Sequence, residues 1–137
     1  MKLCSACLLG KNCRYDGNNN ADEKVLALAK NEELIPVCPE QLGGLPTPRI
    51  YSEVNNGKVI NEAGEDVTEQ FQKGAEETLK IARENNITEA IMKQRSPSCG
   101  CGKIFDGTFS GKVIDGWGIT ADLLRKNGIR VISEEEI

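Results

Sequence analysis

Three short apolar segments of this chain each lead into a cysteine. The segments are residues 2–6, 34–37 and 89–93, and the cysteines that follow them are Cys7, Cys38 and Cys99. Segments of four or five apolar residues bounded by loops are typical of buried β-strands. The chain is therefore expected to build a sheet in which three strands each end in a cysteine-bearing loop.

Helical patterns separate these strands. Apolar residues recur at spacings of three and four over residues 66–86, which predicts the longest helix, and shorter helices are predicted over 21–31 and 118–127. A further strand is predicted over 129–132. This alternation predicts an α/β fold, Rossmann-like and three-layered, with a mainly parallel sheet of about four strands flanked by helices. The Asn55-Asn56-Gly57 turn adds a small β-hairpin.

The length and charge of the chain restrict its organisation and partners. A chain of 137 residues suits one domain with a real core, so residues 1–137 are expected to form a single domain. A net charge of -4 without a long basic run argues against a nucleic acid polymer as partner. No apolar run reaches the roughly 20 residues of a membrane span, so we expect a cytoplasmic protein with no membrane partner. The sequence is compatible with a homodimer.

The topology predicts where the three cysteines lie. Right-handed crossovers place the loops that follow parallel strands at one edge of the sheet, where ligands bind in such folds. If the strands are ordered second, first, third, fourth, then Cys7, Cys38 and Cys99 leave three neighbouring strands. Their thiols would meet although they are far apart in the sequence.

Several roles remain open for the thiols. A reducing cytoplasm disfavours a disulfide framework, and the chain contains no histidine, which excludes His-based catalysis and His-rich metal sites. Burial in the core is the simplest role for a cysteine, and we expect it for Cys4. Three loop thiols fit a closed zinc site poorly and an iron-sulfur cluster better, with one iron left open. Cys13 and Cys101 remain candidates for an extra ligand.

Polar residues near the cysteines are candidates for catalysis. Glu40 follows Cys38 by two residues and could act as a general acid or base, although a solvated loop carboxylate is equally compatible. Ser96 and Ser98 flank Pro97 and could donate hydrogen bonds to a substrate, or simply cap the loop.

Charged and aromatic residues beside the first two cysteine loops are candidates for substrate binding. Arg14, Tyr15 and Asp16 could bind an anion or the edge of a substrate, and a surface turn would explain them nearly as well. Arg49 could pair with a carboxylate in the site.

The order of several short motifs resembles that of a known family. The motifs are Cys7-Leu-Leu-Gly10, Arg14-Tyr-Asp-Gly17, Pro36-Val-Cys-Pro-Glu40, Gly43-Gly44, Pro48-Arg49, Asp66-Val-Thr68, Ser96-Pro-Ser-Cys-Gly100 and Asp106-Gly-Thr-Phe-Ser-Gly111. Together they look like the domain-of-unknown-function 523 family, which contains the thiouracil desulfidases. The resemblance covers the chain almost from end to end.

This resemblance implies a cofactor and a reaction. The cofactor would be a 4Fe-4S cluster held by Cys7, Cys38 and Cys99. Its open iron would take the thione sulfur of a small thiolated base such as 2-thiouracil, while water attacks the carbon in a hydrolytic, non-redox cleavage of the C–S bond. Glu40 would handle protons, and a serine of the loop from Ser96 to Ser98 would assist. Two alternatives are a non-catalytic iron-sulfur or zinc-binding module and a thiol-based sulfur carrier.

Overall fold

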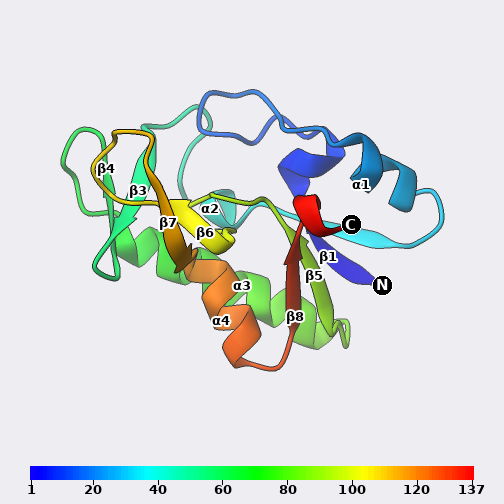
Figure 1. Ribbon diagram of the computed structural model, residues 1–137. Helices are drawn as coiled ribbons and strands as arrows, with labels where there is room; N and C mark the ends of the chain where they lie inside the picture. Colours follow the sequence, from blue (N-terminus) through cyan, green and yellow to red (C-terminus); the bar gives the residue numbers. More distant parts are fainter.

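The fold is built on a parallel sheet of four strands. The computed structural model describes residues 1–137 (Figure 1). The strands are β1 (Lys2–Ser5), β2 (Leu34–Val37), β5 (Glu89–Met92) and β8 (Arg130–Ser133). Their order in the sheet is β2-β1-β5-β8, and every pair is parallel. The predicted sheet and strand order are confirmed, so three neighbouring strands lead into cysteine-bearing segments.

Helices cover both faces of this sheet. They are α1 (Glu23–Leu28), α3 (Thr68–Glu84) and α4 (Ile119–Lys126). Successive residues of β1 point to opposite faces: Leu3 packs with Leu79 of α3 and Leu124 of α4, whereas Cys4 packs with Val25 of α1. Helix, sheet and helix therefore form three layers, as predicted, and the expected burial of Cys4 is confirmed.

Two antiparallel hairpins lie beside the main sheet (Figure 1). The first joins β3 (Ser52–Asn55) to β4 (Lys58–Asn61), and the second joins β6 (Cys101–Phe105) to β7 (Val113–Trp117). Asn56 and Gly57 form the turn of the first hairpin with φ of 51° and 78°, which is the left-handed conformation that an Asn-Gly turn adopts. The small hairpin predicted there is confirmed.

Short helical turns follow three of the sheet strands. They are η1 (Ala6–Leu9), α2 (Pro39–Leu42) and η2 (Glu134–Glu136). The prolines and glycines of residues 38–49 predict a segment without a helix, and the α2 turn corrects that prediction. Pro39 occupies the first position of the turn, where no backbone N–H is needed. Gly43 then allows close packing on α3, since a Cβ there would lie 1.9 Å from the Gln70 carbonyl oxygen.

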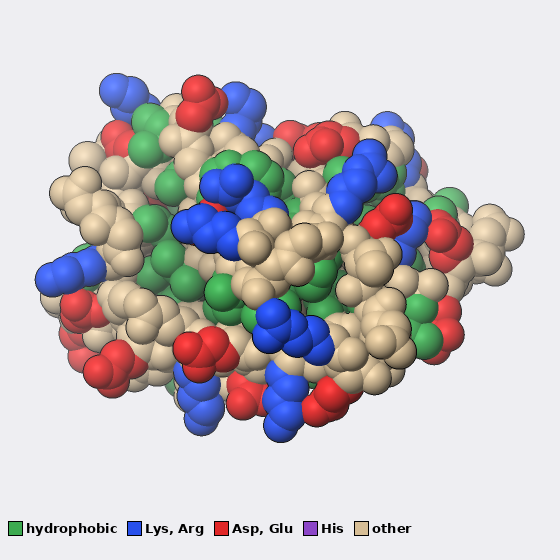
Figure 2. Space-filling model, turned by 90° about the horizontal axis from the view of Figure 1, so that it is seen from below, with side chains coloured by type: hydrophobic (Ala, Val, Ile, Leu, Met, Phe, Trp, Pro, Cys, Tyr) green, Lys and Arg blue, Asp and Glu red, His purple; other side chains and the backbone are tan.

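The surface carries mixed charge. On the face shown in Figure 2, Lys and Arg side chains are interspersed with Asp and Glu side chains and form no continuous basic strip. None of the helices has the length and apolar character that a membrane span requires.

Candidate functional site

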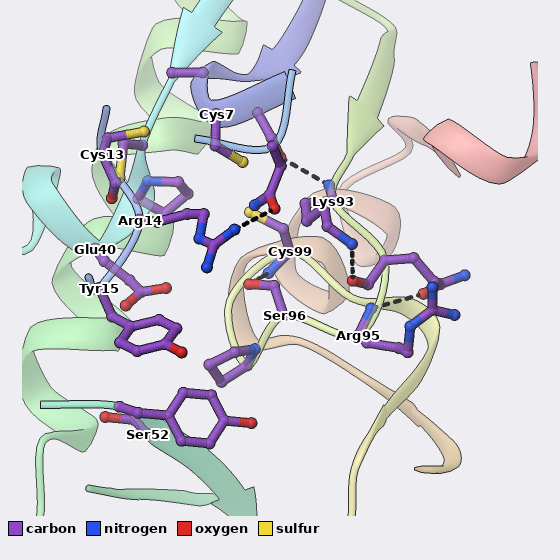
Figure 3. A pocket seen from close by; sticks show the side chains of 18 of the residues that line it. Cys7, Cys13, Arg14, Tyr15, Glu40, Ser52, Lys93, Arg95, Ser96 and Cys99 are labelled. Atoms are coloured by element: carbon purple, nitrogen blue, oxygen red, sulfur yellow. Dashed lines mark hydrogen bonds between the residues drawn. The ribbon is translucent and has the colours of Figure 1, made fainter. Parts of the chain in front are cut away.

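The carboxyl edge of the sheet opens into a cavity of about 300 Å³. Cys7, Cys38 and Cys99 all line it, and they follow β1, β2 and β5 respectively. Figure 3 shows Cys7 and Cys99 on one side of this cavity and Cys13 nearby. The three thiols are thus brought to one site by the parallel strands.

Local structure fixes the first two cysteines. Cys7 lies in η1, directly after β1, and its carbonyl oxygen accepts hydrogen bonds from the N–H groups of Gly10 and Asn20 at 3.1 and 3.0 Å. Cys38 is the N-cap residue of α2, and its carbonyl oxygen accepts the Leu42 N–H at 2.9 Å. Both cysteines are therefore held by a helical turn rather than by a flexible loop.

The loop that carries Cys99 is fixed by the N-terminus of α4. The carbonyl oxygen of Ser98 accepts the N–H groups of Thr120 and Ala121 at 2.9 and 3.1 Å, which satisfies donors that a helix start leaves free. The Gly118 N–H donates to the Gly100 carbonyl at 2.9 Å. A Cβ on Gly118 would lie 2.4 Å from the Ser98 carbonyl oxygen, so only glycine permits this close contact.

Ser96 and Ser98 have different surroundings. Ser96 lines the cavity, and its Oγ accepts the N–H groups of Ser98 and Cys99 at 3.1 and 3.0 Å. Ser98 is 1% exposed, does not line the cavity, and its Oγ lies 2.7 Å from Thr120 Oγ1. Ser96 can reach a bound molecule, whereas Ser98 stabilises the loop from behind.

Arg49 links Glu40 to the loop before α1. Its Nε donates to Glu40 Oε1 at 2.9 Å, and its Nη2 donates to the Cys13 carbonyl oxygen at 2.7 Å. Glu40 and Arg49 both line the cavity. Oε2 of Glu40 has no hydrogen-bond partner in the protein, which leaves it available to water or a ligand.

The predicted binding residues are partly brought together. Arg14, Tyr15 and Arg49 line the cavity, but Asp16 does not. The Asp16 carboxylate instead accepts a hydrogen bond from Arg14 Nη2 at 2.6 Å and one from the Asn18 N–H at 3.0 Å. Asp16 therefore holds the turn and orients Arg14 rather than facing the cavity.

Burial and hydrogen bonding set the ionisation of the cysteines. A hydrogen bond with the Cys13 thiol lowers the pKa of Cys38, helped by the backbone N–H of Gln41 and the charge of Arg49. The same contact with Cys38, together with burial, raises the pKa of Cys13. Cys38 is therefore the member of this pair whose thiolate is favoured, with the Cys13 thiol as its hydrogen-bond donor in that state. As a thiol, Cys38 donates through Sγ to the Cys13 carbonyl oxygen at 3.7 Å. Burial raises the pKa of Cys99 well above its ordinary value.

The remaining cysteines differ in their access to the site. Burial raises the pKa of Cys4 and of Cys101 to about 12, and neither lines the cavity. The Cys101 thiol donates to the Cys99 carbonyl oxygen at 3.2 Å. Cys13 does line the cavity, in contact with Cys38. Of the two extra ligands that the sequence left open, only Cys13 is near enough to take part.

The structure adds cavity residues that the sequence reading missed. Lys93 follows β5, and its Nζ pairs with Glu134 Oε2 at 3.0 Å. The same carboxylate accepts the Gln94 N–H at 2.7 Å, so η2 braces the segment before the Cys99 loop. Lys93 could have been found from its place at the carboxyl end of a strand. Tyr51 also lines the cavity, and no motif in the sequence indicated it.

The donor set fits a cluster better than a single metal ion. No three Cys, Asp or Glu side chains lie close enough together to hold one ion. Thiolates that share one zinc ion, at about 2.3 Å each, lie within about 4 Å of one another. An iron-sulfur cluster takes its thiolates on different irons and so accepts more widely spaced sulfur atoms. Cys7, Cys38 and Cys99 are the residues that could hold such a group.

Fold and site define a class of small α/β protein in which three cysteines that follow neighbouring parallel strands, one carboxylate and three guanidinium groups surround one cavity. Within that class, the chain belongs to the 2-thiouracil desulfurase family, whose model matches residues 3–136. The resemblance inferred from the short motifs is confirmed.

Two relatives are similar over nearly the whole chain. The uncharacterized protein YbbK of Bacillus subtilis (strain 168) is 46% identical over 147 residues, which cover 100% of this chain and 97% of that protein. A solved structure of the 4Fe-4S-dependent thiouracil desulfidase TudS is 42% identical, with a TM-score of 0.94. That match covers 99% of this chain and 91% of the TudS chain.

Proposed function

We propose that this protein is an iron-sulfur-dependent desulfidase that removes sulfur from a thiolated nucleobase such as 2-thiouracil. The observation that carries the proposal is the cavity in which Cys7, Cys38 and Cys99 meet beside Glu40. The similarity to TudS supports it, because that protein is described as a 4Fe-4S-dependent thiouracil desulfidase. Residues 1–137 would act as one domain.

The proposed reaction is hydrolytic and balances without an oxidant or a reductant. 2-Thiouracil and water give uracil and hydrogen sulfide, so one C–S double bond is replaced by a C–O double bond. Cys7, Cys38 and Cys99 would hold a 4Fe-4S cluster, which would supply Lewis acidity toward the thione sulfur. No histidine is needed, since the carboxylate of Glu40 can accept a proton from water.

The chain's own residues supply orientation and proton transfer. Arg49 holds Glu40 through Oε1, so that Oε2 faces a water or a substrate N–H without rotating away. Ser96 lies at the start of the cysteine loop, where its hydroxyl can donate to a substrate carbonyl. Arg14 is held by Asn20 Oδ1 at 3.1 Å and by Asp16, and offers its remaining N–H groups to the electronegative edge of a base.

Cys13 is proposed as a hydrogen-bond partner and not as a fourth ligand. The backbone at Cys13 already serves the site, since its carbonyl oxygen accepts the Cys38 thiol at 3.7 Å and Arg49 Nη2 at 2.7 Å. A site closed by Cys13 would instead favour an electron-transfer or structural module.

The testing experiment combines metal analysis with turnover. The full chain is reconstituted anaerobically with iron and sulfide, and uracil formation from 2-thiouracil is followed in the same sample. We expect about four irons per chain and uracil formation that requires them. A fully loaded protein that releases no uracil would overturn the desulfidase proposal for this substrate. A chain that takes up no iron but binds one zinc ion would overturn the cluster.

A further inference from the structure

Three aromatic rings from separate segments meet in the wall of the cavity. Tyr15, Tyr51 and Phe105 all line it. The centroid of the Tyr51 ring lies 5.2 Å from that of Tyr15 and 6.4 Å from that of Phe105, so Tyr51 is the centre of the group. Figure 3 shows Tyr15 on the same side of the cavity as Glu40.

This aromatic group is not part of the buried cores. The three core clusters do not include Tyr51, Tyr15 or Phe105. Tyr15 is 39% exposed, and Tyr51 is partly exposed although its ring is surrounded by other rings. An aromatic group that only filled the core would be buried, so the partial exposure toward a cavity indicates a surface for a ligand.

One buried carboxylate fixes the orientation of Tyr51. Glu53 is 3% exposed, and its Oε2 accepts the Tyr51 hydroxyl at 2.9 Å. Its Oε1 accepts the N–H groups of Gly107 and Phe109, each at 3.0 Å. Glu53 therefore connects β3 to the loop between β6 and β7, and Tyr51 cannot turn its ring without losing a bond to a buried carboxylate.

The tyrosine ring at the centre of the group stays uncharged. Burial and the neighbouring Glu53 raise the pKa of Tyr51, so the phenol keeps its proton over the whole physiological range. A neutral ring suits stacking or edge-to-face contact with a neutral heterocycle, for which centroid separations of about 4.5–7 Å are favourable.

We propose that Tyr51, with Tyr15 and Phe105, forms a subsite for the planar aromatic ring of the substrate, and that Glu53 is a positioning residue for Tyr51. The inference rests on the proposed function and adds the class of ligand. Planar heteroaromatic rings of pyrimidine size are preferred over saturated, puckered rings that carry the same carbonyl and N–H groups.

Binding of uracil and of 5,6-dihydrouracil tests the subsite without a need for turnover. The two compounds share the same ring carbonyl and N–H groups, but only uracil is planar and aromatic. Equilibrium dialysis with the reconstituted protein is expected to show at least about five-fold tighter binding of uracil. Tyr51→Leu removes the ring and should abolish this preference, while Tyr51→Phe should retain it. Equal binding of both compounds to the unmodified protein would overturn the proposal.

A second set of variants separates positioning from general stability. Glu53→Leu leaves the Tyr51 hydroxyl and the N–H groups of Gly107 and Phe109 without their acceptor, so Tyr51 loses its fixed orientation. We expect a several-fold higher KM for 2-thiouracil, unchanged kcat and unchanged iron content. Phe109→Leu is the matched control, because Phe109 packs edge-on against Tyr51 at 6.0 Å but does not line the cavity. Equal KM increases in Phe109→Leu and Tyr51→Leu would indicate that both variants loosen the loop between β6 and β7. That result would overturn direct contact between the Tyr51 ring and the substrate.

The subsite and the proposed function can fail separately. Turnover of 2-thiouracil with no preference for uracil over 5,6-dihydrouracil would leave the desulfidase function in place and overturn the aromatic subsite. A uracil preference that depends on Tyr51, in a loaded protein that turns over no thiouracil, would support the subsite and overturn the function.

Discussion

The guanidinium of Arg49 and the carboxylate of Glu40 form an ion pair at the cavity, with Arg49 Nε 2.9 Å from Glu40 Oε1. Their side chains are only 6% and 18% exposed. The second arm of the guanidinium reaches the Cys13 carbonyl oxygen. Arg49 thus uses its rigid fork to hold α2 and the loop before α1 together, a geometry that lysine cannot reproduce.

Replacing Glu40 by Gln should stop turnover without removing the cluster. The amide keeps the volume of the side chain but cannot accept a proton, so kcat is expected to fall by at least about a hundred-fold. Iron content and the visible absorption spectrum should match those of the unmodified protein. Glu76→Gln, on the exposed side of α3, is the control and should keep full activity. Full turnover in Glu40→Gln with the cluster intact would falsify the assignment of Glu40 as the proton acceptor.

Substitution of single cysteines should separate ligands from core residues. Cys99→Ser is expected to lose most of its iron after anaerobic reconstitution, since serine is a poor cluster ligand. Cys101→Ser should bind iron normally, because Cys101 is buried and donates its hydrogen bond to the Cys99 carbonyl oxygen rather than facing the cavity. Iron analysis of both variants shows which of the two cysteines is a cluster ligand, and circular dichroism shows that each variant is folded. Loss of iron from a folded Cys101→Ser protein would contradict the assignment.

Much of the fold was accessible from the sequence, because each strand is a short apolar run with a loop after it. Parallel strands send their following loops to one edge, so the meeting of Cys7, Cys38 and Cys99 could be predicted without any contact information. The helical turn Pro39–Leu42 could not, since it depends on packing against α3, where Gly43 meets Gln70. Packing against α3 therefore outweighs the tendency of prolines to prevent a helix in this segment.

The directions in which individual side chains point were harder to predict from the sequence than the fold. Ser96 and Ser98 are the same residue type and lie two positions apart, so the sequence does not distinguish them. The structure shows that α4 covers Ser98. Tyr51 was missed because its place in the cavity depends on Glu53 and on a loop more than fifty residues later in the chain. Such contacts join segments that no local pattern connects.

The two serines of the cysteine loop should respond differently to substitution. Ser98→Ala leaves the buried Thr120 hydroxyl without its partner, so the free energy of unfolding should fall by about 1–2 kcal/mol, with kcat of the folded protein unchanged. Ser96→Ala removes the acceptor for the N–H groups of Ser98 and Cys99 at the cavity and should lower kcat. Urea denaturation and turnover are measured on both variants. A large loss of kcat in Ser98→Ala at full stability would show that Ser98 has a direct role.

The cluster-free chain should be alkylated first at Cys38. The hydrogen bond with Cys13, the Gln41 N–H and Arg49 all favour the Cys38 thiolate and lower its pKa, while burial opposes them. The thiolate is the reactive form, so the rate with iodoacetamide should rise with pH and reach half its maximum below the value of about 8.5 for a free cysteine. Cys99 should react more slowly at every pH, because burial raises its pKa and it is only 5% exposed.

The Cys13→Ala variant tests whether the Cys13 thiol lowers the pKa of Cys38. Without the Cys13 thiol the Cys38 thiolate loses the largest of its stabilising contacts, and burial, which favours the neutral thiol, is less opposed. The midpoint of the alkylation curve should therefore move to higher pH. Mass spectrometry of the labelled peptides, recorded between pH 6 and 9, assigns the rate to Cys38 itself. A midpoint that stays in place, or moves to lower pH, would show that Cys13 is not the donor to Cys38 and would reopen its role as a ligand.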